Sequence, residues 1–246
     1  MKIRRILSLA TIAGAVALVL TGCATDAATA PSATPTPTPD ASAGSTVEID
    51  VEAAWLDNGS MVGLVTLGSS TCVPVADVGG YADGVLEVTL VEDADAACTR
   101  DLVPRVTLVD LPAEVDPTQS LEIKVTGETG AGDAYAGDTD LDGVPGLVRA
   151  EMTDYLPSAG WTDIDGQFVI LTWGSSTCVP VIEDVVASSD NEATVMFVTP
   201  PADQVCTMDM VPRAIVAVVD GLDDEGSFAI LQGAEFDNVR IPILAN

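Results

Sequence analysis

The sequence predicts an all-β protein made of two tandem antiparallel β-sandwich domains, each closed by one disulfide. Three observations support this fold class. The eight residues at 68–75 (GSSTCVPV) return unchanged at 174–181, which indicates an internal repeat. Short runs rich in β-forming residues are separated by Gly, Pro and Asp turns, about 8 to 12 residues apart. No long stretch shows the apolar period of an amphipathic helix.

The first 22 residues are predicted to be a signal peptide. A basic start, residues 2–5 (Lys-Ile-Arg-Arg), precedes an apolar run at 6–20. That run is shorter than a membrane span of about 20 residues and has the length of a signal-peptide core. It ends in 20–23 (Leu-Thr-Gly-Cys), which resembles the lipobox of bacterial lipoproteins. The resemblance implies cleavage before Cys23, lipidation of that cysteine and anchoring at the extracytoplasmic face of the cell membrane. The alternative is an ordinary secretory signal with an incidental cysteine.

Residues 23–47 are predicted to be the lipidated cysteine and a disordered tether. The segment consists mainly of Ala, Thr, Pro, Ser and Asp, with Pro and Thr alternating from 35 to 39. Such a composition cannot bury a core, and its Pro-rich part favours an extended conformation. We expect it to hold the folded part away from the membrane, with O-linked sugar on its threonines as an alternative role.

The two predicted domains span 48–150 and 151–246. Trp55 and Trp161 each stand 17 residues before the first cysteine of their copy, so the repeat begins well before the identical stretch. This equal spacing favours tryptophans packed in two cores over an aromatic platform for sugars.

Turns and strands alternate within each copy. Hairpin turns are expected at 58–59 (Asn-Gly) and 165–166 (Asp-Gly). The runs that follow, 61–67 and 167–173, are predicted strands with apolar residues on both faces, as expected for a strand covered on both sides. Further strands are predicted at 85–91, 103–111, 121–126, 193–199, 214–219 and 228–231. About seven strands per copy suggest an immunoglobulin-like sandwich or a small barrel, as an analogy of fold only.

Four cysteines follow Cys23, two at equivalent positions in each copy. Equivalence within the repeat selects one of the three connectivities, Cys72 with Cys98 and Cys178 with Cys206. An exported location makes disulfides the expected state of these thiols.

Composition excludes several classes of function. Nine Lys and Arg stand against 38 Asp and Glu, for a formal net charge of -29. This surface repels phosphate backbones, so we expect no nucleic-acid partner. Histidine is absent, which removes the commonest general base and metal ligand. We therefore expect no catalytic residues and no enzymatic activity.

The repeated stretch looks superficially like the loop of a catalytic nucleophile. The nucleophile elbow needs glycine two places after its serine, whereas Cys72 stands two places after Ser70. A serine–lysine pair would depend on Lys124, which has no equivalent in the second copy. We expect a tight turn whose hydroxyls bond local backbone groups. The block GSSxCxP followed by CTxDxxP resembles a domain of actinobacterial lipoproteins, a resemblance that carries no known activity.

Two arginines are repeated in this acidic chain. Arg105 and Arg213 each stand four residues after an equivalent acid, Asp101 and Asp209. We expect each Asp–Arg pair to form a structural ion pair after the second cysteine of its copy. A clamp for a ligand carboxylate is the alternative.

A short acidic motif raises the question of calcium. Residues 138–143 (DTDLDG) match the opening of an EF-hand-like loop, with Asp138, Asp140 and Asp142 as ligands. The twelfth position holds Arg149 instead of the bidentate Glu. The repeat aligns this segment with the last strand of the second copy, so a terminal strand is the competing interpretation.

These observations favour a monomeric, non-enzymatic lipoprotein of the cell envelope that acts as a binding or structural module and needs no cofactor. Its cell-wall or protein ligand is not indicated by the sequence. A calcium-dependent adhesion module and a carboxylate-based envelope hydrolase are the alternatives.

Overall fold

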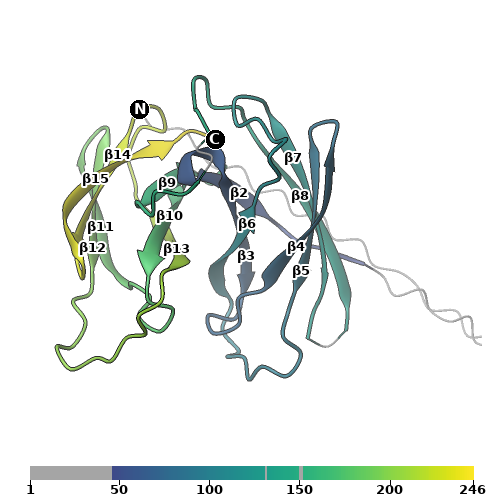
Figure 1. Cartoon of the computed structure of the whole chain (residues 1–246), viewed down its shortest axis with the longest axis horizontal. Helices are drawn as coiled ribbons and strands as arrows, with labels where there is room; N and C mark the ends of the chain where they lie inside the picture. Colours follow the sequence, from purple (N-terminus) through teal and green to yellow (C-terminus); the bar gives the residue numbers. More distant parts are fainter. Residues whose placement is uncertain (1–45, 131, 150–151) are drawn as a thin grey trace, which may run out of the picture. The chain divides into compact units, whose positions relative to one another are not determined.

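The computed structural model describes residues 46–130, 132–149 and 152–246 (Figure 1). The predicted signal peptide, Cys23 and nearly all of the tether lie outside these ranges. The described residues form strands β1 to β15 and one short 3-10 turn, so the fold is all-β as predicted. Within this part of the chain, no helix is long and apolar enough to cross a membrane.

The first repeat contains two sheets. One has the order β2-β3-β6 and the other the order β1-β8-β7-β5-β4. The strands are β1 (Val47–Glu48), β2 (Glu52–Leu56), β3 (Met61–Gly68), β4 (Val75–Ala82), β5 (Val85–Val91), β6 (Val103–Asp110), β7 (Leu121–Glu128) and β8 (Ala134–Leu141). The hairpin expected at 58–59 joins β2 to β3, which pair antiparallel.

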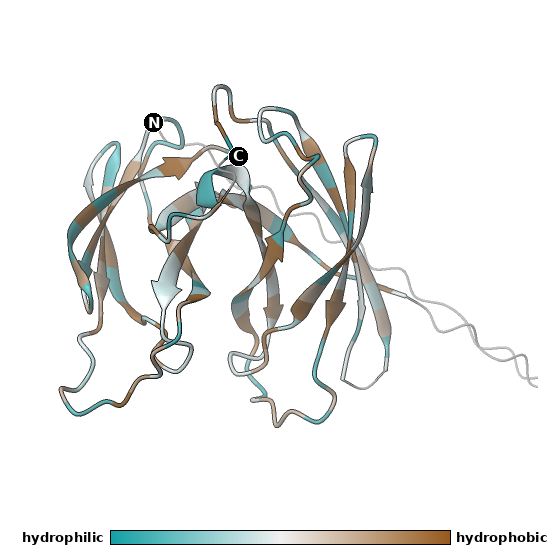
Figure 2. Ribbon diagram, in the orientation of Figure 1, coloured by the Kyte–Doolittle hydropathy of each residue, from teal (hydrophilic) through white to brown (hydrophobic). Residues whose placement is uncertain are grey.

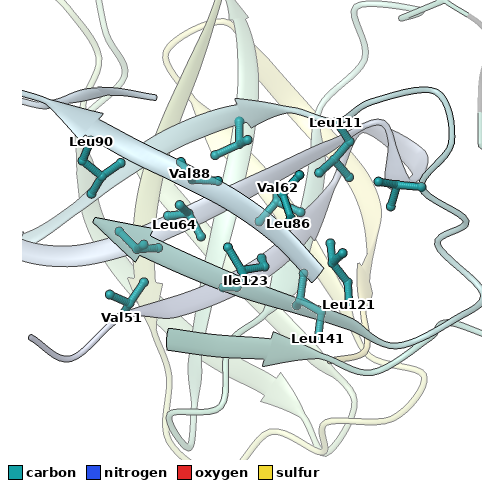
Figure 3. Close-up of a cluster of buried hydrophobic side chains, with 14 of the residues drawn as sticks. Val51, Val62, Leu64, Leu86, Val88, Leu90, Leu111, Leu121, Ile123 and Leu141 are labelled. Carbon is teal, nitrogen blue, oxygen red and sulfur yellow. The ribbon is translucent and has the colours of Figure 1, made fainter. Parts of the chain in front are cut away.

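Both sheets contribute to one core. Buried and exposed residues alternate along β5 and β7, so each strand turns one apolar face inward. Figure 2 shows the same alternation of hydrophobic and hydrophilic residues along these strands. The inward side chains meet those of β2 and β3 around Trp55, which is fully buried. Figure 3 shows the cluster, which includes Val62, Leu64, Leu86, Val88, Ile123 and Leu141.

The second repeat has seven strands, which follow the same succession as β2 to β8 of the first and are joined in one sheet. Its order is β11-β12-β14-β15-β9-β10-β13. The strands are β9 (Ser158–Trp161), β10 (Gln167–Gly174), β11 (Ile182–Ser189), β12 (Glu192–Phe197), β13 (Val211–Val218), β14 (Phe228–Gly233) and β15 (Phe236–Leu244). The end of β15 pairs with β9, at Ile243 opposite Ala159. This pairing connects two strand sets that are separate sheets in the first repeat.

The sheets are mixed, which corrects the prediction of purely antiparallel pairing. Strands β5 and β7 pair parallel, and so do their counterparts β12 and β14. The reason is the crossover between them. After β5 the chain crosses to pair β6 with β3, and after β12 it crosses to pair β13 with β10. It then returns beside the strand it left and runs in the same direction as that strand.

The two repeats pack against each other through the second face of their central strands. Residues 61–66 of β3 and 167–172 of β10 are buried throughout, which confirms the prediction that both strands are covered on both sides. A separate cluster joins Leu56, Met61 and Val65 of the first repeat to Val169 and Leu171 of the second. All described residues belong to one compact unit, so the repeats are not independent bodies.

Candidate functional site

The repeated stretch lies where β3 and β10 end and includes the first cysteine of each disulfide. Cys72 bonds to Cys98 and Cys178 to Cys206, with Cα atoms 5.5 and 5.6 Å apart. Both predicted disulfides are therefore confirmed. Each bridge ties the end of a central strand to the loop that leads into β6 or β13.

Hydroxyl groups and one carboxylate hold each disulfide loop. Ser69 and Thr99 place their hydroxyl oxygens 2.7 Å apart, and Asp101 accepts the Ser70 amide N–H at 3.2 Å and the Thr99 hydroxyl. Hydrogen bonding from Ser70 and then from Thr99 lowers the pKa of Asp101 to about 2. The serine and threonine hydroxyls of the apparent nucleophile motif thus bond within the loop.

The second repeat reproduces this arrangement. Ser175 and Thr207 are again 2.7 Å apart, and the Ser176 amide N–H donates to Asp209 at 3.1 Å. Hydrogen bonding from Ser176 and then from Thr207 lowers the pKa of Asp209 to about 2. The duplication therefore preserves a loop, with its polar contacts, around each disulfide.

The two arginines are paired, although with acids other than those predicted. Arg105 forms an ion pair with Glu92 at 2.6 Å, and Arg213 forms one with Glu235. The expected pairs with Asp101 and Asp209 are wrong, because residues four apart on an extended chain lie about 13 Å apart. Both acids instead accept hydrogen bonds from the disulfide loops.

Each guanidinium group also fastens the first cysteine of its bridge. Arg105 donates to the carbonyl of Cys72, and Arg213 donates to that of Cys178 at 2.8 Å. The side chains of Arg105 and Arg213 are only 9% and 4% exposed, so both guanidinium groups make their ion pairs and hydrogen bonds away from solvent. This burial disfavours the alternative role as a clamp for a ligand carboxylate.

The structure places the predicted calcium ligands on a strand. Asp138 and Asp140 belong to β8 and are paired with Lys124 and Glu122 of β7, and Asp142 follows the strand. The loop expectation is therefore corrected, because ladder pairing takes the backbone that an EF-hand-like loop would curve around a cation. In the described ranges, no group of three or more Cys, Asp and Glu residues is arranged to hold a metal ion.

One acid outside the motif lies near this strand. Burial, and then the charges of Asp140 and Asp142, raise the pKa of Asp163. Its carboxylate accepts a hydrogen bond from Asn246 at 3.0 Å, while Asn246 accepts the Asp142 amide N–H at 3.3 Å. Asp163 stands two residues after Trp161, as Asp57 does after Trp55, and the sequence gives no sign that it lies near the acidic motif.

Both repeated tryptophans are core residues. Trp55 and Trp161 are 0% and 2% exposed, and Trp161 meets Phe168 edge-on with ring centroids 5.1 Å apart. Neither ring offers a face to a sugar in solution.

A groove of about 810 Å³ is lined by β6 and β13 at the disulfide end of the repeats. Its lining is mainly apolar and comes from both repeats: Ser70, Val73, Val103, Pro104, Arg105, Val106, Leu108, Ser176, Val179, Val181, Val211, Pro212, Arg213, Ala214, Ile215 and Val216. These residues include no Asp or Glu, although acids are the dominant charge of the chain. A second hollow of about 480 Å³ adjoins it and shares Val179, Val181 and Arg213.

Exposed apolar side chains flank this groove. Leu102 precedes β6 and is 72% exposed, and Met210 precedes β13 and is 59% exposed. Val205 lies in the loop closed by the second disulfide, Met208 follows two residues after Cys206, and both are exposed almost completely. The sequence contained these residues, but only the packing of the repeats brings them to one end.

No family model, curated protein or solved structure matches this chain. The candidate site therefore rests on the geometry described above.

Proposed function

We propose that the protein is a lipid-anchored, extracytoplasmic lipoprotein that acts as a non-enzymatic binding module, and that each repeat is an immunoglobulin-like β-sandwich or small barrel. The anchor would be Cys23, as the lipobox-like sequence indicates. The ligand would be a segment of another envelope protein, bound in the groove between β6 and β13.

The observation that carries this function is the segregation of charge at the groove. The chain has 38 acids, yet the lining of the groove has only two charged residues, both of them arginines already engaged in ion pairs. Exposed apolar residues in a contiguous patch are typical of a protein–protein interface. Depletion of charge at the centre with charge around it is the usual plan of such an interface.

The negative charge around the groove indicates the charge of the partner. The acidic surface outside the groove attracts positively charged segments and repels negatively charged ones. The best match is therefore an apolar segment with Lys or Arg at its margins.

Two synthetic peptides test this proposal. One alternates Leu with Lys and the other alternates Leu with Glu; both carry a fluorophore, and binding to the purified protein is followed by fluorescence anisotropy. We expect the Leu–Lys peptide to bind more tightly. The Val181→Asp substitution, at a half-exposed position in the groove, should weaken its binding roughly tenfold.

Val186→Asp provides the matched control. Val186 is 52% exposed, close to the 59% of Val181, and does not line the groove. It adds the same charge, so binding should change little beyond a general electrostatic effect. Equal losses in the two variants would show that the peptide binds the acidic surface and not the groove, and the proposal would fail.

A further inference from the structure

Another cavity, also of about 480 Å³, is distinct from the groove and shares only Trp173 with the hollow that adjoins it. Its walls include Asp57 and Ser60 at the β2–β3 turn, Asp110 at the end of β6, and Trp173 of the second repeat. Arg149 and Thr153 add to it from the segment that connects the repeats. It shares no lining residue with the groove.

The cavity contains a buried carboxylate without a cationic partner. Asp57 is 3% exposed and accepts hydrogen bonds from the hydroxyls of Ser60 at 2.7 Å and Thr153 at 3.3 Å. In the described part of the chain, Asp57 takes part in no ion pair. Buried charges in proteins are usually paired, because an isolated ion loses its hydration without compensation.

The nearby arginine does not supply that pair. Arg149 donates to the main-chain carbonyls of Leu111 at 2.6 Å and Val115 at 3.4 Å, and also to that of Pro112. Its guanidinium group therefore holds the segment after β6. The buried carboxylate of Asp57 in the cavity wall therefore has no counter-ion among the described residues.

An unusual backbone conformation positions Asp57. Asp57, Asn58 and Gly59 all have left-handed φ values, of 46°, 52° and 76°. Such conformations are costly for residues other than glycine and cluster at functional sites. Two contacts maintain them: the Asp57 amide N–H donates to the Ser158 hydroxyl at 2.9 Å, and Gly59 fits so tightly that an added Cβ would lie 2.5 Å from Pro117.

The equivalent position in the second repeat lacks these properties. Asp163 is exposed and does not have a positive φ. Its turn needs only one left-handed residue, Gly166. The strained and buried carboxylate is thus specific to the first repeat.

An aromatic residue completes the cavity. Trp173 lines it and is held edge-on by Tyr155, with ring centroids 5.1 Å apart and an interplanar angle of 82°. The repeat has Leu67 at the position equivalent to Trp173. An aromatic ring beside a carboxylate is a favourable environment for an ammonium group, through cation–π attraction and charge pairing.

We propose that this cavity binds a small organic cation that carries an ammonium group, with Asp57 as its counter-ion and Trp173 as its aromatic wall. Ser60 and Thr153 hold the carboxylate toward the bound cation. Asp110, which also lines the cavity, adds a second negative charge and disfavours anionic ligands. This site is independent of the proposed peptide groove.

Calorimetric titration of the purified full chain with n-butylammonium tests the proposal, and n-butanol serves as the neutral ligand of the same chain length. We expect saturable binding of the ammonium compound in the millimolar range and none of the alcohol. Asp57→Asn should weaken ammonium binding about 30-fold, the effect of removing one partner of a buried charge pair. Asparagine tolerates left-handed φ, so this substitution preserves the turn.

Two further variants separate a binding role from a structural one. Asp163→Asn removes the equivalent acid of the second repeat and should leave binding unchanged. Trp173→Leu installs the residue of the first repeat and should weaken binding without involving the strained turn. The proposal is overturned if the unsubstituted protein shows no saturable binding, if n-butanol binds equally well, or if Asp163→Asn weakens binding as much as Asp57→Asn.

Discussion

The packing of the two repeats predicts a large effect for Leu171→Ala. Leu171 is fully buried on β10, in the cluster that joins the repeats. Replacing a buried leucine with alanine costs about 2.7 to 5 kcal/mol, as lost transfer free energy plus a cavity. If the outer face of β10 were open to solvent, as in an independent domain, the cost would stay within about 0.5 kcal/mol.

Urea unfolding followed by circular dichroism gives the free energy of unfolding of the variant. Hydrogen exchange by mass spectrometry shows which strands lose stability. Because Leu171 touches residues of both repeats, exchange should accelerate in β3 as well as in β10. Val218→Ala, at a site that is 56% exposed, is the control and should change little. Two separate unfolding transitions, with the first repeat unaffected by Leu171→Ala, would refute the inference of one cooperative unit.

Three other predictions concern the disulfides, the loop carboxylates and the anchor. Replacing both Cys178 and Cys206 with Ser opens a loop with a sequence separation of 28 residues. On the chain-entropy model this should lower the free energy of unfolding by about 3.6 kcal/mol. An unchanged midpoint of urea unfolding would contradict this prediction. Asp101 has a folded pKa of about 2 against an ordinary 3.8, so it stabilises the fold above pH 4 and loses this contribution as the pH falls through 2. Asp101→Asn should therefore lower stability at neutral pH, with a difference from the unsubstituted protein that disappears near pH 2, and a pH-independent difference would argue against this cause. Cys23→Ala should move the protein from the membrane fraction to the soluble fraction, and its persistence in membranes would exclude lipid anchoring through that residue.

Local sequence patterns predicted the central strands well, because their signals are strong. The strand at 85–91 has the predicted bounds, and the hairpin dipeptides at 58–59 and 165–166 lie between paired strands. The strands that were not predicted include β4 and β11. Both are sheet edges with no fully buried residue, so they lack the apolar alternation that identifies a half-buried strand.

The candidate sites were harder to predict because they depend on contacts between distant segments. The sequence indicated that 61–67 and 167–173 are covered on both faces, but it did not identify the covering element as the other repeat. The cavity of Asp57 depends on Trp173, more than a hundred residues away, and on a turn with three left-handed residues. The Asp–Arg pairs were inferred from the equal spacing of these residues in both copies, whereas the actual partners, Glu92 and Glu235, come from segments distant in the sequence.

The two buried arginines also bear on how the copies diverged. Each guanidinium lies over a glycine at the end of a central strand, where an added Cβ would come within 2.3 Å of Arg105 or 2.8 Å of Arg213. The acids that neutralise them come from different places, since Glu92 follows β5 and Glu235 lies in the turn between β14 and β15. The two copies thus share the glycine and the arginine and differ in the source of the negative charge. What they have in common is a guanidinium group packed directly on glycine backbone, and carboxylates from two different segments neutralise it.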